Sequence, residues 1–203
     1  MLITRINKYF IYIFIALLVL TAPTAAKADT IVGGVELDWP LKNQEEREKA
    51  INYYKELLFN REMVYEIPKE QFKPFKKDPH FLENREALKK GELVLPEREL
   101  GAFYVMKKML VIYGVKYNND KYHIYYYDAL GRLAYYDVLD KPFDEFPHIA
   151  KQYDSSGRLV GFSYYISDYD QYIFEDKQNF KGRWYGEKLY DKRAKSTMTR
   201  KLP

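Results

Sequence analysis

The sequence predicts an α+β protein whose N-terminal helices pack on a roughly seven-stranded antiparallel β-meander of hairpin repeats. Three observations predict this class. Helical patterns are confined to the N-terminal half, tyrosine-rich alternating segments follow from residue 109, and one turn sequence occurs twice. We therefore expect four regions: a signal peptide at 1–28, a mostly helical segment at 29–108, a tyrosine-rich β-repeat region at 109–190 and a basic tail at 191–203.

The composition indicates a globular domain and excludes several kinds of site. With 203 residues and a hydrophobic fraction of 47%, the chain can bury a core. It contains no cysteine, which excludes disulfides, thiolate metal sites and a cysteine nucleophile. The formal charge of +4 falls nearly to zero when Arg5, Lys8 and Lys27 of the first region are set aside. The nearly neutral charge of the rest of the chain argues against a nucleic-acid partner.

The first region has the three parts of a secretory signal peptide. Arg5 and Lys8 give a positive start, an apolar run covers 10–20, and Ala26 and Ala28 provide small residues for a signal peptidase. The apolar run is too short for a membrane-spanning helix, which needs about 20 residues. We expect cleavage after Ala28 and export to the periplasm or the outside of a bacterium, with membrane contact only before cleavage. An uncleaved anchor is the alternative.

Helical signals follow the expected cleavage site. Asn43 can cap a helix that runs to about Phe59, with acidic residues in its first turn and an apolar stripe on one face. Residues 84–90 predict a short helix ended by Gly91. Residues 97–108 predict a further helix that leads into the sheet. These helices are expected to cover one face of the sheet, since a bare meander buries too little apolar surface.

The second half alternates between short strands and turns. Methionine, valine and tyrosine side chains share one face of 109–117, which is typical of a half-buried strand. The tail either adds an edge strand through 196–199 or frays. The expected strands are 109–117, 122–127, 132–138, 148–153, 159–166, 172–175 and 183–190.

Two tight turns hold this region in register. In each, an Asp can accept the backbone N–H two residues on, and a Gly takes the positive φ of the turn. A third, degenerate copy has Asn in place of Gly, and Asn tolerates the left-handed backbone best after Gly. The turn-forming residues are Asp128 and Gly131, Asp154 and Gly157, and Asp176 and Asn179.

The string Tyr-Asp-x-x-Gly-Arg-Leu at 127–133 and 153–159 resembles the YD-repeat (Rhs-type) motif. It is also similar to the aromatic β-hairpin repeats of MORN-like bacterial proteins. The resemblance covers about 110–190 and implies hairpins that stack into a continuous sheet. Large members wrap this sheet into a shell, but two good copies and one poor one enclose nothing. The motif residues build turns and imply no chemistry.

Our functional interpretation is an exported, non-catalytic protein that binds a partner through an aromatic sheet surface. The partner is expected to be an envelope protein or a cell-wall glycan, and no cofactor is expected. The candidate binding residues are Tyr125, Tyr127, Tyr136, Trp184 and Tyr185.

Two other function classes stay open. An envelope hydrolase would use a carboxylate pair such as Asp168 with Glu175, and a structural subunit of a surface assembly would use no site at all. The acidic turns also have the oxygen ligands that Ca²⁺ prefers, although they match no ligand register. The three histidines, His80, His123 and His148, lack the spacing of a metal pair, so no metal site is predicted.

Overall fold

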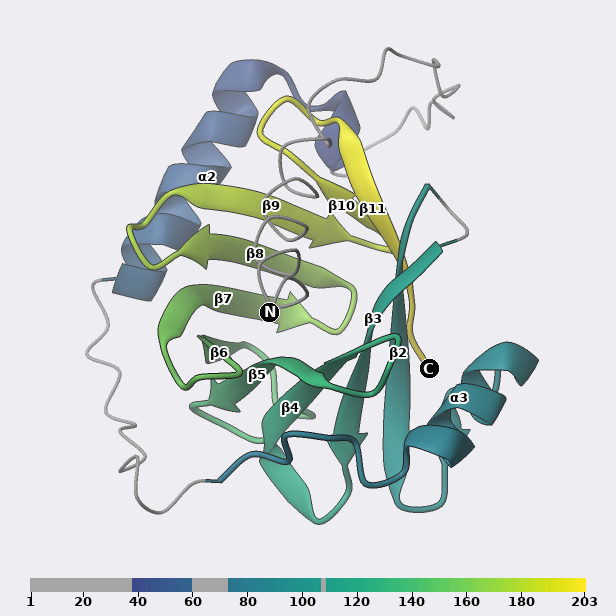
Figure 1. Cartoon of the computed structure of the whole chain (residues 1–203). Coiled ribbons are helices and arrows are strands. Elements are labelled where there is room, and N and C mark those ends of the chain that lie inside the picture. Colours follow the sequence, from purple (N-terminus) through teal and green to yellow (C-terminus); the bar gives the residue numbers. More distant parts are fainter. Residues whose placement is uncertain (1–37, 60–72, 107–108) are drawn as a thin grey trace, which may run out of the picture. The chain divides into compact units, whose positions relative to one another are not determined.

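A computed structural model describes residues 38–59, 73–106 and 109–203 of the chain (Figure 1). The expected signal peptide at 1–28 lies outside these residues, as does the start of the expected helical segment. Among the described helices, none combines the length and apolarity needed to cross a membrane.

The sheet is a closed antiparallel barrel, so the expectation of an open seven-stranded meander under N-terminal helices is wrong. The strands from β2 to β11 form a ring in the order β2-β11-β10-β9-β8-β7-β6-β5-β4-β3, and β3 pairs back with β2. The short β1 adds to β2. The strands are β1 Val94–Leu95, β2 Arg98–Val105, β3 Met109–Tyr117, β4 Asp120–Asp128, β5 Leu133–Leu139, β6 His148–Asp154, β7 Leu159–Ser167, β8 Asp170–Glu175, β9 Phe180–Tyr185, β10 Lys188–Tyr190 and β11 Ser196–Lys201.

Two strands close the ring: β2, which the sequence does not predict, and β11, which corresponds to the edge strand expected as one of two alternatives for 196–199. β2 replaces the helix expected at 97–108, and β11 lies in the expected basic tail, where Arg200 pairs with Phe103 of β2. β2 is buried on both faces: Leu100 packs in the cluster beneath α3, while the Phe103 ring contacts Trp184 inside the barrel. A strand buried on both faces shows no polar alternation, which explains the wrong prediction. Closure gives each strand from β2 to β11 a neighbour on both sides, so only the short β1 ends the sheet among the described strands.

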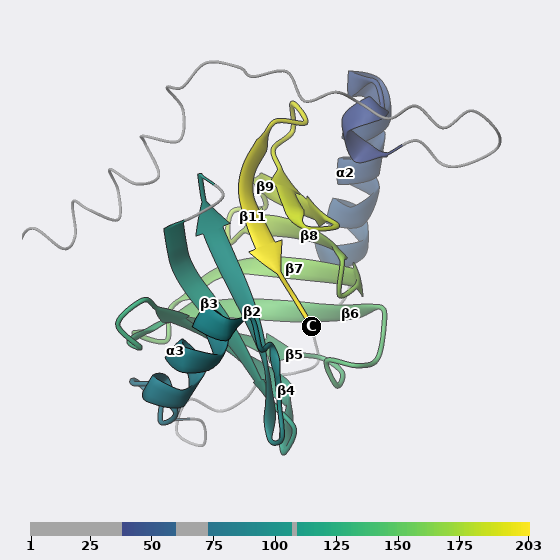
Figure 2. The same ribbon diagram turned by 90° about the vertical axis from the view of Figure 1, so that its right-hand side faces the viewer.

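The first helix, α2 (Gln44–Phe59), begins with the expected cap. The Glu46 N–H donates to Asn43 Oδ1 at 2.9 Å, and the Asn43 N–H donates to Glu46 Oε2 at 3.0 Å, which is a capping box. Its buried residues Ile51 and Leu58 pack with Trp39, which lies in the short 3₁₀ helix η1 (Trp39–Leu41). Together they cover the outer face of β6 to β8 (Figures 1 and 2).

The second helix, α3 (Phe81–Lys90), covers a different outer face of the barrel. It ends at Gly91, which takes a left-handed φ of 76°, and its Ala87 packs against the outer side chains of β2 to β5. Figure 2 shows α3 beside β2 and far from α2. The two helices therefore cover separate walls of a barrel rather than one face of a sheet.

The two full Tyr-Asp-x-x-Gly-Arg-Leu copies form the same turn. Asp128 Oδ1 accepts the N–H groups of Leu130 and Arg132, each at 2.9 Å, and Gly131 has a φ of 73°. At the second copy Asp154 Oδ1 accepts the N–H groups of Ser156 and Arg158 at 2.9 and 3.0 Å, and Gly157 has a φ of 82°. The carboxylate thus satisfies two backbone donors of each hairpin.

The third copy is shifted by one residue from the expected Asp176–Asn179 register. The Gln178 N–H donates to the Glu175 carbonyl, and Gln178, not Asn179, has the positive φ of 63°. Glu175 and Gln178 therefore stand where Asp and Gly stand in the full copies. The shift was not predicted because Asp176 and Asn179 are residue types that favour such a turn, whereas Glu175 and Gln178 are not.

A fourth copy, which the sequence analysis missed, joins β10 to β11. Asp191 Oδ1 accepts the N–H groups of Arg193 and Lys195 at 2.8 Å each, and Ala194 has a φ of 60°. Because Ala stands in the Gly position, the motif was not visible in the sequence. All four turns join an even-numbered strand to the next odd-numbered one, so they lie at one end of the barrel.

The two repeat glycines provide a matched stability test. Gly157→Ala is expected to cost about 1 kcal/mol, because an L-residue is strained at a positive φ and only the Tyr136 hydroxyl lies near, at 3.7 Å. Gly131→Ala is expected to cost about 1 kcal/mol more, because its Cβ would lie 2.5 Å from the Phe81 ring. Denaturant unfolding measures the loss of stability in each variant. Equal losses would show that the Phe81 ring moves away from the added Cβ without an energetic cost.

Candidate functional site

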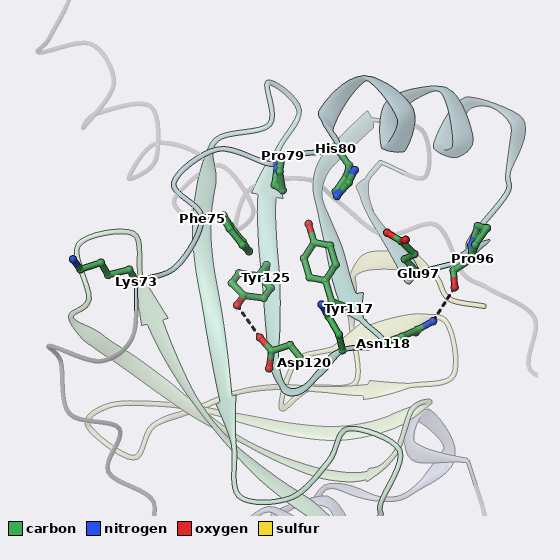
Figure 3. A pocket seen from close by; sticks show the side chains of 11 residues that line it. Lys73, Phe75, Pro79, His80, Pro96, Glu97, Tyr117, Asn118, Asp120 and Tyr125 are labelled. Atoms are coloured by element: carbon green, nitrogen blue, oxygen red, sulfur yellow. Dashed lines mark hydrogen bonds between the residues drawn. The ribbon is translucent and has the colours of Figure 1, made fainter.

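A pocket of about 580 Å³ opens on the outer wall of the barrel (Figure 3). It lies between the segment 73–80, the β1–β2 turn and the β3–β4 turn. Its volume is in the range of small-molecule binding sites. Its lining residues are Lys73, Phe75, Pro79, His80, Pro96, Glu97, Tyr117, Asn118, Asn119, Asp120 and Tyr125.

Aromatic rings form the floor of the pocket. The Tyr117 and Tyr125 ring centroids are 5.7 Å apart, and the Phe75 ring lies 6.3 Å from Tyr117 and 5.9 Å from Tyr125. The two tyrosines are anchored in the barrel wall, whereas Phe75 is 51% exposed. A ligand can therefore contact an aromatic surface that is fixed on one side and open on the other.

Asp120 is held at the base of the pocket by two neighbours. Its Oδ1 lies 2.7 Å from His123 Nδ1, and its Oδ2 accepts the Tyr125 hydroxyl proton at 2.9 Å. Burial favours the neutral acid, but the hydrogen bond and charge of His123 and the Tyr125 hydroxyl outweigh it and lower the pKa of Asp120. Asp120 is therefore a carboxylate at neutral pH and accepts hydrogen bonds.

The two turns at the rim are tied together by Asn118. Its backbone N–H donates to the Glu97 carbonyl at 3.0 Å, and its Nδ2 donates to the Pro96 carbonyl at 3.1 Å. Figure 3 shows Glu97 and Asn118 on the same side of the Tyr117 ring. The rim therefore carries carboxylate and amide groups in a fixed arrangement beside the aromatic floor.

A buried polar network fixes the wall formed by 73–80. Asp78 Oδ2 accepts the Tyr113 hydroxyl proton at 2.5 Å and an Asn84 Nδ2 proton at 2.9 Å, while its Oδ1 accepts the His80 N–H at 2.9 Å. Asn84 Oδ1 in turn accepts from Arg98 Nε of β2 at 2.7 Å. The network joins the wall, α3 and the barrel, so the pocket is largely preformed.

The Tyr117 hydroxyl is buried and has no hydrogen-bond partner in the part of the chain that the structure describes. Burial, then the charge of Asp78, raises its pKa to about 12, so it stays protonated at neutral pH. A buried hydroxyl without a partner is uncommon and marks a place where water or a ligand group completes the bonding.

The five residues expected to bind do not form one exposed platform. Tyr125 lines the pocket, whereas Tyr127 is fully buried and Tyr136 nearly so in the same cluster. Trp184 lies inside the barrel against Phe103, and Tyr185 donates its hydroxyl proton to Asp38 Oδ1 at 3.1 Å on another wall. Only Tyr125 therefore belongs to the pocket.

The carboxylates proposed as a hydrolytic pair are not brought together. Asp168 pairs with Lys116 at 2.7 Å, and Glu175 pairs with Lys181 at 2.9 Å. β8 separates the two acids by roughly 16 Å at about 3.3 Å per residue. Glycosidase pairs lie within about 10 Å of each other.

Comparisons with known proteins give no match. No family model, no curated protein and no solved structure matches this chain. Within residues 38–59, 73–106 and 109–203, no three His, Asp or Glu side chains are grouped to hold a metal ion.

Most of the pocket was missed by sequence reasoning. Glu97 was assigned to a helix, and Asn118 and Asn119 were assigned to a plain hairpin turn. The available signal was the polar turn directly after Tyr117, because a turn that ends an aromatic strand places amides beside the rings. Phe75, 42 positions before Tyr117, gives no such local signal.

Proposed function

We propose that this chain is an exported, non-catalytic binding protein that holds a neutral sugar unit of an envelope glycan in the pocket above Tyr117 and Tyr125. The observation that carries the proposal is the combination of an aromatic floor with a rim of carboxylates and amides. This combination matches a sugar, which has an apolar C–H face and a perimeter of hydroxyl groups.

The aromatic floor provides the contact with the apolar face. Rings offer a flat surface of low conformational entropy cost, and C–H groups make weak favourable contacts with it. Phe75 is exposed and stands over the tyrosines, so it can pack on a bound ring with little loss of existing contacts.

The rim provides partners for the hydroxyl groups. Carboxylates such as Asp120 accept hydroxyl protons, while the amides of the β3–β4 turn both donate and accept. The pocket has two carboxylates, Glu97 and Asp120, against one lysine, Lys73. This balance favours a neutral ligand over an anionic one.

The state of Asp120 supports binding rather than hydrolysis. Glycoside hydrolysis needs a carboxylic acid whose pKa is raised, so that it protonates the leaving group. The pKa of Asp120 is instead lowered, so Asp120 does not have this property. An ionised Asp120 can accept a hydrogen bond from a sugar hydroxyl group, but it has no proton to donate to a leaving group.

Calorimetric titration of the full chain with N-acetylglucosamine oligosaccharides tests the proposal. Phe75→Ala is expected to weaken binding about 2- to 10-fold, because an aromatic contact contributes about 0.5 to 1.5 kcal/mol beyond its area. Leu82→Ala is the matched control, since Leu82 is 72% exposed and lies outside the pocket.

Three outcomes would contradict the proposal. One is the absence of saturable sugar binding by the unmodified chain. Another is an equal loss of affinity in Phe75→Ala and Leu82→Ala, which would show that sugar binding does not depend on the pocket. The third is release of shorter oligosaccharides, which would indicate a hydrolase instead.

A further inference from the structure

Arg200 is an unusual residue because its charge lies inside the barrel. Only 3% of the residue is exposed, and it projects from β11 on the same face as Phe103 and Trp184. Its guanidinium lies 4.7 Å from the centre of the Trp184 ring. Its Nε donates to the Gly186 carbonyl at 3.2 Å, but its Nη2 has no partner among the described residues.

No carboxylate within the described part of the chain forms an ion pair with Arg200. Asp168, whose charge acts on it, is already paired with Lys116 at 2.7 Å. Asp137, the buried acid of the interior, accepts hydrogen bonds from Tyr126, Tyr165 and Gln152. Burying a guanidinium without a counter-charge is costly, and arginine cannot escape the cost by losing its proton at neutral pH.

We propose that the barrel interior binds a small oxyanion, a carboxylate or phosphate group, against the guanidinium of Arg200. The planar fork of arginine suits two oxygens of such a group, and Nη2 is the donor left for it. Burial lowers the pKa of Arg200 to about 10, so the side chain remains a cation at neutral pH. This site is independent of the outer pocket.

The end of the barrel opposite the four Asp turns is the route to this site. Arg200 contacts Gly186 in the β9–β10 turn, and the Gly186 N–H donates to the Tyr169 carbonyl in the β7–β8 turn. The same turn carries Asp168, whose partner Lys116 comes from β3 on the opposite side of the ring of strands. The Lys116–Asp168 pair therefore spans this end, and an incoming anion that displaces the Asp168 carboxylate would meet the Lys116 cation.

Trp184 provides the reporter for a binding experiment. The chain has two tryptophans, and Trp39→Phe leaves Trp184 as the single tryptophan, which can be excited selectively over the tyrosines. We expect sodium phosphate or sodium acetate to change Trp184 emission saturably at constant ionic strength, and sodium chloride to give no such change. Arg200→Gln, made in the same background, should weaken the response at least 10-fold. Arg158→Gln is the control, since Arg158 is exposed and pairs with Asp154 at the other end.

Several results would overturn the proposal. These are a response that chloride reproduces, a response that Arg200→Gln retains, or no response at all. Crystals of the unmodified full chain soaked in selenate give a test that needs no variant, should Arg200→Gln fail to fold. An anomalous peak within hydrogen-bond distance of Arg200 Nη2 supports the site, and an ordered water there instead refutes it.

Discussion

Asp78→Ala is expected to lower the free energy of unfolding by about 3 to 5 kcal/mol, because it leaves several buried donors without an acceptor. Asp78 is 6% exposed and accepts from the Tyr113 hydroxyl, from Asn84 Nδ2 and from the His80 N–H. Tyr113 and Asn84 are themselves buried, so water does not replace the lost carboxylate. Each such donor costs about 1 to 3 kcal/mol when unsatisfied.

The same substitution is expected to weaken sugar binding in the outer pocket. Asp78 holds the start of α3 and the adjoining wall, which contains Pro79 and His80, against β3. Urea unfolding measures the stability loss, and calorimetric titration measures the loss of affinity. Asp176→Ala is the control, because Asp176 is exposed and lies on a distant hairpin. A loss of stability equal to that of the control would show that the network contributes nothing.

The strands between 109 and 175 could be predicted because their local signals agree with their surroundings. In β3, Tyr113, Val115 and Tyr117 face the outer cluster, and alternation in the sequence reflects this directly. The turn residues also predicted the strand register, because Asp128 and Asp154 each accept two backbone N–H groups of their hairpin. Local sequence sufficed for the turns at Asp128 and Asp154, but not for the β8–β9 turn, whose register is shifted, or for the β10–β11 turn, where Ala194 stands in the Gly position.

Closure of the barrel could not be predicted, because it depends on a pairing between distant segments. β2 and β11 are almost one hundred positions apart, and neither carries a local sign of the other. For the segment of β11 the sequence left an edge strand and a frayed tail as alternatives, since its buried Arg200 belongs to a residue type that is usually exposed. The outer pocket depends on the same long-range packing, which brings Phe75 onto Tyr117 and Tyr125.

Asp137→Asn is expected to remove a stability penalty that the unmodified chain carries at neutral pH. Asp137 is fully buried, and burial raises its pKa to about 6, although Gln152, Tyr126 and Tyr165 donate to it. The unfolded chain releases this proton near pH 4. Between pH 4 and 6 the folded state therefore holds more protons than the unfolded state, and the contribution of Asp137 to stability falls as the pH rises. Two pKa units correspond to about 3 kcal/mol.

The difference in unfolding free energy between Asp137→Asn and the unmodified chain isolates the contribution of Asp137. Other acids, such as Asp120 and Asp154 with lowered pKa values, give the opposite trend, but they are present in both proteins and cancel. Urea unfolding at pH 4, 5, 6 and 7 should show Asp137→Asn gaining about 3 kcal/mol relative to the unmodified chain. A pH-independent difference would mean that the pKa of Asp137 in the folded protein is no higher than in the unfolded chain. Its three donors would then fully offset its burial, and the carboxylate would persist beside the cation of Arg200 in the barrel interior even below pH 6.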